Sequence, residues 1–550
     1  MCGVWLLVGK KLTMVSPSML LEKLIARGPE GSRLVDLSGV SLGFTRLAIN
    51  GLTDAGMQPM NLGGTHWLCN GEIYNWKQLQ ADHGFTHLES HSDCEVLGPL
   101  YSVLQNNLTS YFRSLDGVFA LSIVDLSRNR VIVGRDPYGV RPLYQGLIYD
   151  ADKKLVARMF ASEIKALNHI CSDIHPVTPG SYYAYDLTTL RIVDHAIYHK
   201  PHWIVNPSYS PAHPNGLDNA CGALRFALEE AVRKRLMTER PVAALLSGGI
   251  DSSLIASLVS RQLRELGKPP LKTFSIGMPG STDLAYARQV AKWIGSEHTE
   301  VVMTPAQFFA AIPKVIYDIE TYDTTSVRAS VGNWLVSKEI KARCDAKVVF
   351  NGDGSDEIFG SYLYFYNAPT DRDFEEETER LLRDIHSFDV LRSDRCISSH
   401  GLEPRTPFLD KQFVAVAKQI ATCWRRPSSS RCEKWILRRA FDDGVTLPRE
   451  VLWRRKEAFS DGVSSTEKSW YQEIQERCDS LIEDDWKVRM QETPNIDHLT
   501  PKTKEQYYYR YFFHTCFGTD DVTVVPYFWM PKWTPGATDP SARTLAVYSS

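Results

Sequence analysis

Cys2, the second residue of the chain, has the functional groups of a nucleophile. The sequence begins Met-Cys-Gly, and an initiator methionine is normally removed when a residue as small as cysteine follows it. Cys2 would then carry a thiol and a free α-amine, with reference pKa values of about 8.5 and about 7.7–8.0. A residue that supplies both a nucleophile and a nearby base is suited to acyl transfer. Taken alone, Cys2 is also compatible with a position that has no catalytic role.

Acyl transfer also needs hydrogen-bond donors for the oxyanion that it forms, and the sequence offers candidates. Asn70 and Gly71 follow a strand-like run at 65–69, and the Asn70 side-chain amide and the Gly71 N–H could form an oxyanion hole. Arg46 could bind a carboxylate through two N–H groups, and Asp93 could bind an ammonium group. Each of these residues also fits a simpler interpretation: a turn, a surface arginine and a helix cap.

Residues 247–253, Ser-Gly-Gly-Ile-Asp-Ser-Ser, have the composition of a phosphate-binding loop. They lie between an apolar run at 242–246 and a helical pattern at 254–266. Glycines let the backbone approach phosphate oxygens, and N–H groups at a helix start favour an anion. The lysine of a Walker A motif is absent, so this is not a Walker A loop. A Gly-Ser turn at a helix start is the alternative.

A second loop, 351–357, is acidic and follows a strand-like run at 347–350. Parallel sheets bind ligands beyond the carboxyl ends of their strands, so this loop could face 247–253. Asp251 and Asp356 would then be carboxylates for Mg²⁺, which prefers one or two carboxylates with phosphate oxygens and water. An acidic surface turn is the alternative.

Phosphate groups held by these loops would need a cationic partner, for which Lys456 is the first candidate. Lys434 and Arg438 are weaker candidates. Their i, i+4 spacing puts both on one helix face, which by default is a solvated face.

The elements that must position these residues change in kind along the chain. The amino-terminal region is rich in strands with hairpin signals, such as 118–125 with 130–134, and helical patches lie between them. Strands and helices then alternate strictly from 242 to 350, which indicates a parallel sheet covered by helices. Beyond 371 the pattern is mostly helical. We therefore predict an α+β sandwich (2–195), a Pro-rich linker (196–218), an α/β parallel-sheet domain with a helical carboxyl-terminal part (219–530), and an irregular tail (531–550).

Composition excludes several classes of protein. The chain has 550 residues, a net charge of −3, 43% hydrophobic and 23% charged residues, which is typical of globular proteins and not of nucleic-acid binders. No apolar run approaches the ~18 residues of a membrane helix, and the apolar start precedes its lysines, unlike a secretory signal. The 11 cysteines include no Cys-x-x-Cys pair. We expect a cytoplasmic protein without disulfides, structural zinc, nucleic-acid partners or membrane partners.

Together, the amino-terminal motifs resemble class II glutamine amidotransferases of the N-terminal-nucleophile type. The match includes Arg27-Gly-Pro-Glu30, the segment 70–75, Leu115-Asp-Gly117 and Arg135-Asp-Pro-Tyr-Gly139. The resemblance implies two stacked antiparallel sheets between helical layers, with Cys2 attacking the side-chain amide of glutamine. It implies that Asn70 and Gly71 stabilise the oxyanion. The implied glutamine-binding residues are Arg46, Leu47, Ala48, Ile49, Asn50, Asn70, Gly71, Glu72 and Asp93.

The whole chain resembles glutamine-hydrolysing asparagine synthetases, in which such a domain precedes a PP-loop domain that splits ATP into AMP and pyrophosphate. Strings such as 405–410, Arg-Thr-Pro-Phe-Leu-Asp, and 459–462, Phe-Ser-Asp-Gly, carry the match onward. The resemblance implies that aspartate attacks the α-phosphate to give β-aspartyl-AMP, from which ammonia displaces AMP. The implied ATP and pyrophosphate residues are Leu246, Ser247, Gly248, Gly249, Asp251, Ser252, Ile276, Asn351, Gly352 and Lys456. Arg328 is implied to bind aspartate, and Asp251 and Asp356 to hold Mg²⁺ with ATP.

The chain departs from this family at three positions. Ala26 replaces the histidine that often precedes Arg-Gly-Pro, which we expect to alter only loop packing. Asn351 and Asp353 replace the Ser and Glu of the second loop. Asp353 is our further catalytic candidate, together with Cys2, Asn70, Gly71 and Lys456, but it is one methylene shorter than Glu. A misplacement of ~1 Å can lower a rate by ~10²-fold.

Three alternatives compete with this interpretation. A ligase similar to β-lactam synthetase would need no ammonia, but such relatives lose the amino-terminal cysteine. Other class II amidotransferases carry sugar-isomerase or phosphoribosyltransferase domains, which the loop at 247–253 excludes. A scaffold protein that kept only the fold should have lost Cys2, Asp251 or Asp356, and all three are present. The sequence does not decide the oligomeric state, for which a homodimer is one option.

Overall fold

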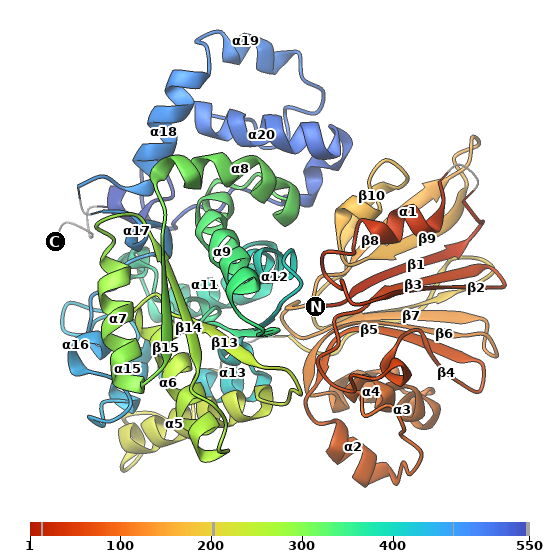
Figure 1. The fold of residues 1–550 in the computed structure, drawn as a ribbon, viewed down its shortest axis with the longest axis horizontal. Helices are drawn as coiled ribbons and strands as arrows, with labels where there is room; N and C mark the ends of the chain where they lie inside the picture. Colours follow the sequence, from red (N-terminus) through yellow and green to blue (C-terminus); the bar gives the residue numbers. More distant parts are fainter. Residues whose placement is uncertain (13–14, 201–203, 466, 546–550) are drawn as a thin grey trace.

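The structure is a computed structural model that describes residues 1–12, 15–200, 204–465 and 467–545. Figure 1 shows a strand-rich amino-terminal part beside a larger part in which helices surround a parallel sheet. The predicted succession of fold classes, α+β followed by α/β, is confirmed. Residues 201–203 of the predicted linker and 546–550 of the predicted tail lie outside the described residues.

The amino-terminal part contains two six-stranded antiparallel sheets, with strand orders β10-β8-β9-β1-β3-β2 and β12-β11-β7-β6-β5-β4. The strands of the first are β1 (Gly3–Gly9), β2 (Ser32–Leu37), β3 (Val40–Thr45), β8 (Tyr144–Tyr149), β9 (Leu155–Ala161) and β10 (Ser172–Pro176). Those of the second are β4 (Met60–Leu62), β5 (Thr65–Ile73), β6 (Gly117–Asp125), β7 (Arg130–Arg135), β11 (Ser181–Asp186) and β12 (Ile192–Ile197). The helices of this part are α1 (Pro17–Glu22), α2 (Trp76–His83), α3 (Leu97–Leu104) and α4 (Leu108–Ser114).

The side chains of β1 point alternately to the two faces of its sheet, and β1 holds Cys2 at its amino-terminal end. Val4 and Leu6 pack into the core between the two sheets, whereas Trp5 and Leu7 face a second core that includes residues of α1. Successive side chains of a strand point to opposite faces, so these residues cover both. Because β1 pairs with β3 on one side and with β9 on the other, the position of Cys2 directly before it is well defined.

Strand β5 is longer than the sequence pattern predicted. We predicted a strand at 65–69 with Asn70 and Gly71 after it, but β5 continues to Ile73 and pairs with β6 along its whole length. Asn and Gly are depleted in strands, which hid this continuation. A residue type that disagrees with its local secondary structure is typical of functional sites, where residues are retained for chemistry and not for the fold.

The second part is built on a parallel sheet of strand order β15-β14-β13-β16-β17. Its strands are β13 (Val242–Leu245), β14 (Lys272–Gly277), β15 (Glu297–Val302), β16 (Val348–Phe350) and β17 (Glu403–Arg405). The sequence pattern missed β17, because a strand of three residues carries no periodic signal.

Helices cover both faces of this sheet and form the rest of the second part (Figure 1). They are α5 (Gly216–Arg235), α6 (Ile250–Glu265), α7 (Thr282–Ile294), α8 (Pro305–Ile319), α9 (Thr324–Arg343), α10 (Ser355–Phe359), α11 (Asp371–Asp384), α12 (Asp389–Ser398), α13 (Lys411–Lys418), α14 (Thr422–Arg425), α15 (Trp435–Ala440), α16 (Arg449–Leu452), α17 (Phe459–Gly462), α18 (Trp470–Leu481), α19 (Trp486–Gln491) and α20 (Lys504–Phe517). α5 begins inside the predicted linker, and α6 begins four residues before the predicted helix, so Asp251 lies in its first turn. None of the described helices is long and apolar enough to span a membrane.

The two parts share hydrophobic cores and are not merely tethered. One core joins Leu47, Ile49 and Tyr138 of the sandwich with residues of α5 and α6. Helix α12 packs against α9 and β17 close to this boundary. The elements that carry the candidate functional residues are therefore held in fixed positions relative to each other.

Candidate active sites

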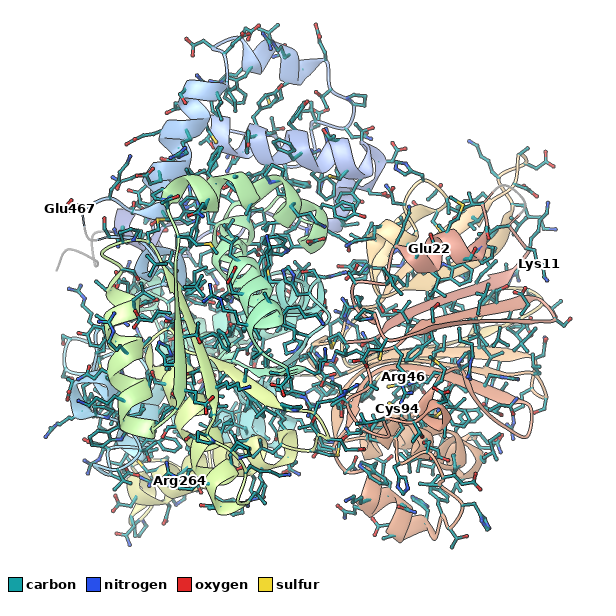
Figure 2. The ribbon with its side chains drawn as sticks, in the orientation of Figure 1. Lys11, Glu22, Arg46, Cys94, Arg264 and Glu467 are labelled. Carbon is teal, nitrogen blue, oxygen red and sulfur yellow. The ribbon has the colours of Figure 1, made fainter. Side chains whose placement is uncertain are left out.

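A small cavity of about 30 Å³ lies beside Cys2, where the two parts meet. Its lining comes from the loop after β3, from β5 and, from the second part, Glu403. The Cys2 thiol donates a long hydrogen bond to the carbonyl oxygen of Leu47, 3.7 Å away. Arg46 and Cys94, labelled in Figure 2, line the same cavity. A small substrate in this cavity would therefore meet the sulfur of Cys2.

Asn70 is placed to stabilise negative charge near that sulfur. Its side-chain oxygen accepts a hydrogen bond from the backbone nitrogen of Cys2 at 3.1 Å, and its amide nitrogen is buried without a partner among the described residues. A buried unpaired donor is costly, and a ligand or transition state that completes it explains its presence. Gly71 has no room for a side chain, because a Cβ would collide with the Val118 carbonyl oxygen.

The other predicted glutamine-binding residues all line this cavity: Arg46, Leu47, Ala48, Ile49, Asn50, Gly71, Glu72 and Asp93. Arg46 donates to the carbonyl oxygens of Thr53, at 2.7 Å, and of Gly51. A guanidinium has five N–H donors, so Arg46 retains donors for a ligand. Asn50 donates to Glu72 at 2.7 Å, which orients one wall of the cavity.

Burial sets the protonation states around Cys2. It raises the pKa of Asp93 to about 6, although the Ile73 N–H donates to this carboxyl at 2.6 Å. Burial, and then the neighbouring Asp93, raise the pKa of Glu72 well above its ordinary value. Burial also raises the pKa of the Cys2 thiol to about 11 with Met1 attached. The thiol is therefore neutral in this form and needs a base to become a nucleophile.

Arg27 connects Cys2 with the second part of the molecule. Its buried guanidinium donates to the Cys2 carbonyl oxygen at 3.0 Å and to Glu163 at 2.7 Å. It also pairs with Asp394 of α12 at 2.9 Å. The position of Cys2 and the position of α12 therefore depend on one side chain.

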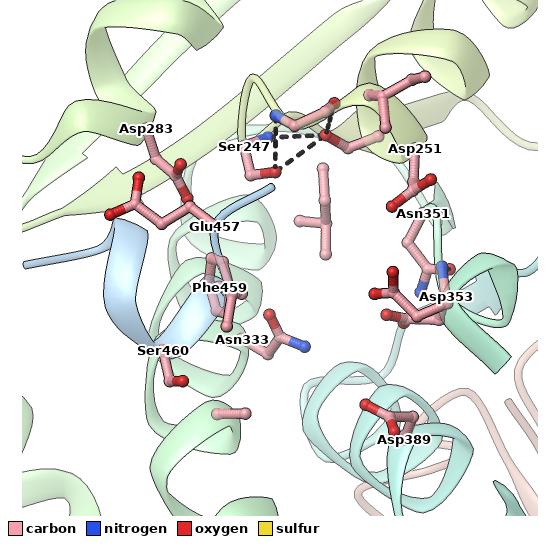
Figure 3. Close-up of a pocket in the computed structure, with 18 of the residues that line it drawn as sticks. Ser247, Asp251, Asp283, Asn333, Asn351, Asp353, Asp389, Glu457, Phe459 and Ser460 are labelled. Atoms are coloured by element: carbon pink, nitrogen blue, oxygen red, sulfur yellow. Dashed lines mark hydrogen bonds between the residues drawn. The ribbon is translucent and has the colours of Figure 1, made fainter. Parts of the chain in front are cut away.

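A larger cavity of about 210 Å³ lies beyond the carboxyl ends of β13, β14 and β16. The predicted ligand residues that line it are Leu246, Ser247, Gly249, Asp251, Ser252, Ile276, Asn351, Gly352, Asp353, Asp356 and Lys456. Gly248 does not line it but turns the loop, because its φ is +75° and a side chain there would collide with Tyr286. Figure 3 shows Ser247 on one side of this cavity and Asp353 on another.

The loop at 247–253 is closed on itself by its serines. The Ser252 hydroxyl contacts the Ser247 hydroxyl at 3.0 Å and accepts from the Ser247 N–H at 3.1 Å, as the dashed lines in Figure 3 show. Helix α6 starts at once at Ile250, and the unpaired N–H groups of a helix start favour an anion. A Cβ on Gly352 would lie 2.7 Å from the Ser252 nitrogen, so the two predicted loops are in direct contact.

Two lysines, of which Lys434 is buried and Lys456 is half-buried, neutralise the acidic residues of this cavity. The ammonium of Lys456 lies 2.6 Å from Asp356, and that of Lys434 pairs with both Asp356 and Asp251. Burial alone would raise the pKa of Asp356, but the two ammonium groups hold it well below its ordinary value. Both lysines are therefore already in position for a phosphate group that enters the cavity.

The interpretation of Lys434 and Arg438 as a solvated helix face is wrong. Their exposed fractions are 0% and 1%. The i, i+4 rule requires both residues to belong to one helix, whereas Lys434 precedes α15 with a φ of 57°. Arg438 points inward and donates to the Glu433 carboxylate at 2.8 Å and to the Leu452 carbonyl oxygen at 2.6 Å.

Comparison with known proteins decides the family. The family model described as "Asparagine synthase" matches residues 223–377 and 366–534, and the model "Glutamine amidotransferase domain" matches residues 1–209. A Gallus gallus protein named asparagine synthetase [glutamine-hydrolyzing] is 40% identical to this chain over 100% of its length and 99% of the relative's. The chain belongs to the asparagine synthetase family. A Mus musculus protein of the same name is 39% identical, with the same shares of both chains covered.

Among solved structures, a glutamine phosphoribosylpyrophosphate amidotransferase from B. subtilis covers 56% of this chain and 91% of its own. Its sequence identity is 17% and its TM-score is 0.32. A similarity of this size carries no argument about the sites of the asparagine synthetase family.

One residue that the family resemblance implied for aspartate, Arg328, is not brought to the larger cavity. Arg328 is buried and pairs with Glu505 at 2.6 Å and with Asp539 at 2.8 Å. The face of α9 that lines the cavity carries Thr325, Ala329, Asn333 and Val336, and Arg328 lies on a neighbouring face. The geometry therefore gives no support to contact between Arg328 and aspartate.

Asp353, which replaces the Glu of the asparagine synthetase family, is held by an arginine that the sequence did not single out. Arg392 of α12 lies 3.0 Å from one Asp353 oxygen, and the other oxygen is buried without a partner among the described residues. Asn351 donates to the Ser393 hydroxyl at 2.6 Å. No periodicity or motif pointed to α12, which approaches the loop only through the fold.

The acidic residues of the larger cavity fit a magnesium ion that shares phosphate oxygens. Oδ1 of Asp251 is buried without a partner among the described residues. The part of the chain that the structure describes has no group of three or more His, Cys, Asp or Glu side chains that could hold a metal ion without other ligands. Mg²⁺ uses few carboxylates when phosphates and water complete its shell, so Asp251 and Asp356 would hold it together with ATP.

Proposed function

We propose that this chain makes asparagine from aspartate, with glutamine as nitrogen donor and ATP as the source of activation. The observation that carries this proposal is the presence of two cavities in one molecule with complementary chemistry. One has a thiol near an amide donor without a partner among the described residues, and the other has a serine-glycine loop beside two lysines that pair with its carboxylates. The names of the similar full-length proteins support the same reaction.

At the first cavity, the sulfur of Cys2 attacks the side-chain amide carbon of glutamine. The Asn70 amide and the Gly71 N–H donate to the oxyanion. The α-amine of Cys2, free once Met1 is removed, takes the thiol proton and passes it to the leaving ammonia. Water then hydrolyses the thioester and releases glutamate. Arg46 binds the carboxylate of the substrate and Asp93 binds its ammonium group, while Glu72 orients Asn50 at the same end of the site.

At the second cavity, the loop at 247–253 holds the phosphates of ATP while the side-chain carboxylate of aspartate attacks the α-phosphate. Pyrophosphate leaves toward Lys456 and Lys434, which balance its charge. Mg²⁺, when held by Asp251 and Asp356, supplies further neutralisation of the phosphates. Ammonia from the first cavity then attacks the β-aspartyl carbonyl, and AMP leaves. The unpaired oxygen of Asp353 takes the proton that the attacking nitrogen loses.

The glutaminase unit of the proposed enzyme ends near residue 195, close to the end of β12 at Ile197. The synthetase unit begins near 219, shortly after the start of α5 at Gly216. The enzyme acts in the cytoplasm, where glutamine, aspartate and Mg-ATP are all present.

The test is a product assay with Mg-ATP and aspartate that supplies either glutamine or ammonium to the native chain and to Cys2→Ala. We expect asparagine, AMP and pyrophosphate from both nitrogen sources in the native chain, and loss of only the glutamine-driven reaction in the variant. Formation of glutamate without asparagine would leave the first half of the proposal and remove aspartate as the acceptor.

A further inference from the structure

We propose that Asp389 and Arg392 of α12 recognise the α-ammonium and α-carboxylate groups of the amino-acid substrate. This inference rests on the proposed function, because it assigns the part of the synthetase cavity that selects aspartate. Both residues line the cavity of about 210 Å³. They take the place of Arg328, which pairs with acidic residues outside the cavity.

The position of these residues matches the geometry of the proposed reaction. Figure 3 shows Ser247 of the phosphate loop at one end of the cavity, Asp389 at the opposite end, and Asp353 between them. An aspartate whose side-chain carboxylate meets the α-phosphate must extend away from the phosphate loop. Its α-carbon groups would then reach the end of the cavity formed by α12.

Arg392 has unused hydrogen-bonding capacity toward this space. It is 8% exposed, and both of its hydrogen bonds use Nη2, at 3.0 Å to Asp353 and at 3.0 Å to Asp389. Its Nε and Nη1 groups make no hydrogen bond to the described residues. Nε and Nη1 lie on different edges of the guanidinium, so each can donate a single charge-assisted hydrogen bond to a carboxylate oxygen, and the two acidic neighbours keep the guanidinium fixed in one orientation.

Asp389 supplies the complementary charge. One of its oxygens accepts from Arg392, and the other lies 3.1 Å from the hydroxyl of Tyr362, which also bonds to Glu357. The Asp389 carboxylate is therefore held in place at the wall of the cavity, where it could accept hydrogen bonds from an ammonium group.

The test uses two substrate analogues that each lack one of the recognised groups. β-Alanine is aspartate without its α-carboxylate, and succinate is aspartate without its α-ammonium. Binding of aspartate, β-alanine and succinate is measured by calorimetry on the full chain saturated with a non-hydrolysable ATP analogue and Mg²⁺. The proteins compared are the native chain, Arg392→Gln, Asp389→Asn and a matched control, Arg454→Gln, whose arginine lines the same cavity but pairs with Asp283 and Glu457.

We expect Arg392→Gln to weaken the binding of aspartate by ~10²-fold or more. The affinity for β-alanine should change by less than ~3-fold, because β-alanine lacks the group that Arg392 binds. Asp389→Asn should weaken the binding of both aspartate and β-alanine and leave the affinity for succinate nearly unchanged. Arg454→Gln should leave the preference for aspartate over both analogues unaltered.

The outcomes separate this inference from the function on which it rests. If the native chain neither binds aspartate nor releases pyrophosphate with it, the proposed function is wrong and the inference falls with it. If the native chain does both but Arg392→Gln weakens aspartate and β-alanine equally, Arg392 only positions Asp353 and the inference alone is overturned. Glutaminase activity reports whether each variant is folded. Arg392→Lys, which keeps the charge without the planar guanidinium, replaces an Arg392→Gln variant that does not fold.

Discussion

The two cavities are prepared for their ligands in opposite ways. Next to Cys2, the Asn70 amide nitrogen is a buried donor without a partner among the described residues. In the larger cavity, Lys434 and Lys456 are instead fully engaged by Asp251 and Asp356. A site that stabilises one developing charge can leave a single donor unpaired. A site for a polyanion needs several buried cations, which would be too costly without carboxylates to hold them until the polyanion arrives.

The largest difference between the two activities is expected from a variant that removes the Asp353 side chain. We expect Asp353→Ala to lower asparagine formation from either nitrogen source by ~10³-fold, because the general base for the attacking nitrogen is lost. Glutaminase activity should stay within ~2-fold of the native chain. Asparagine and glutamate are quantified in parallel by amino-acid analysis. Asp353→Glu, which restores the side-chain length usual in the family, is the control, and unchanged synthesis in Asp353→Ala would remove Asp353 from the mechanism.

The opposite result, loss of glutaminase activity with synthesis retained, is expected from a variant at Asn70. We expect Asn70→Ala to lower the kcat of glutamine hydrolysis by ~10²–10³-fold, since one oxyanion donor is removed. Asparagine formation from ammonium should be unaffected, because Asn70 is not among the described residues that line the larger cavity. A glutaminase rate close to that of the native chain would show that the unpaired amide of Asn70 does not meet the oxyanion.

A third variant tests whether the lysines are held ready for phosphate. We expect Lys434→Met to lower kcat/KM for ATP by ~10²-fold, because two carboxylates lose a buried partner and repel the incoming phosphates. Lys434→Arg keeps the charge and should retain most of the activity. Initial rates of pyrophosphate release at varied ATP distinguish the two, and equal rates in Lys434→Met and the native chain would contradict a role for this pair in ATP binding.

The smallest effect is a pH dependence of the first cavity. Burial raises the pKa of Asp93 to about 6, and Asp93 must be ionised to bind the substrate ammonium. The carboxylate is present above this pH and is lost below it. We therefore expect kcat/KM for glutamine to fall by ~10-fold per pH unit below about 6. The decline should vanish in Asp93→Asn, which has a low rate at every pH, and should persist in Asn70→Ala.

Sequence reasoning located residues whose signal is local. Cys2, the loop at 247–253 and the hairpin of β6 with β7 could all be predicted, because short strings or alternating runs identify them. Asn70 was predicted to act together with Cys2 although its strand was cut short, and its side-chain oxygen accepts a hydrogen bond from the Cys2 backbone nitrogen. These cases share one property, which is that the informative residues are neighbours in the chain.

The residues that could not be predicted depend on contacts between distant segments. Lys434 was only a weaker candidate, with a solvated helix face as its default interpretation, because the helix rule was applied to a residue that precedes the helix. Asp389 and Arg392 face the cavity only because α12 packs beside α9 and β17, and periodicity does not tell which buried face of a helix meets a ligand. Arg328 shows the converse, since a matching motif placed it in a site that its own side chain does not reach.

The guanidinium of Arg27 bears on how this enzyme could be rebuilt from parts. The chain offers an obvious place to cut, the Pro-rich linker, but Arg27 ties the carbonyl of Cys2 to Asp394, a residue far beyond that linker. A glutaminase unit transplanted from a relative would therefore work as a cassette only if it brought an arginine that fits Asp394. The modules of this protein are separable in its sequence but not in its packing, and a successful chimaera must exchange both sides of that contact.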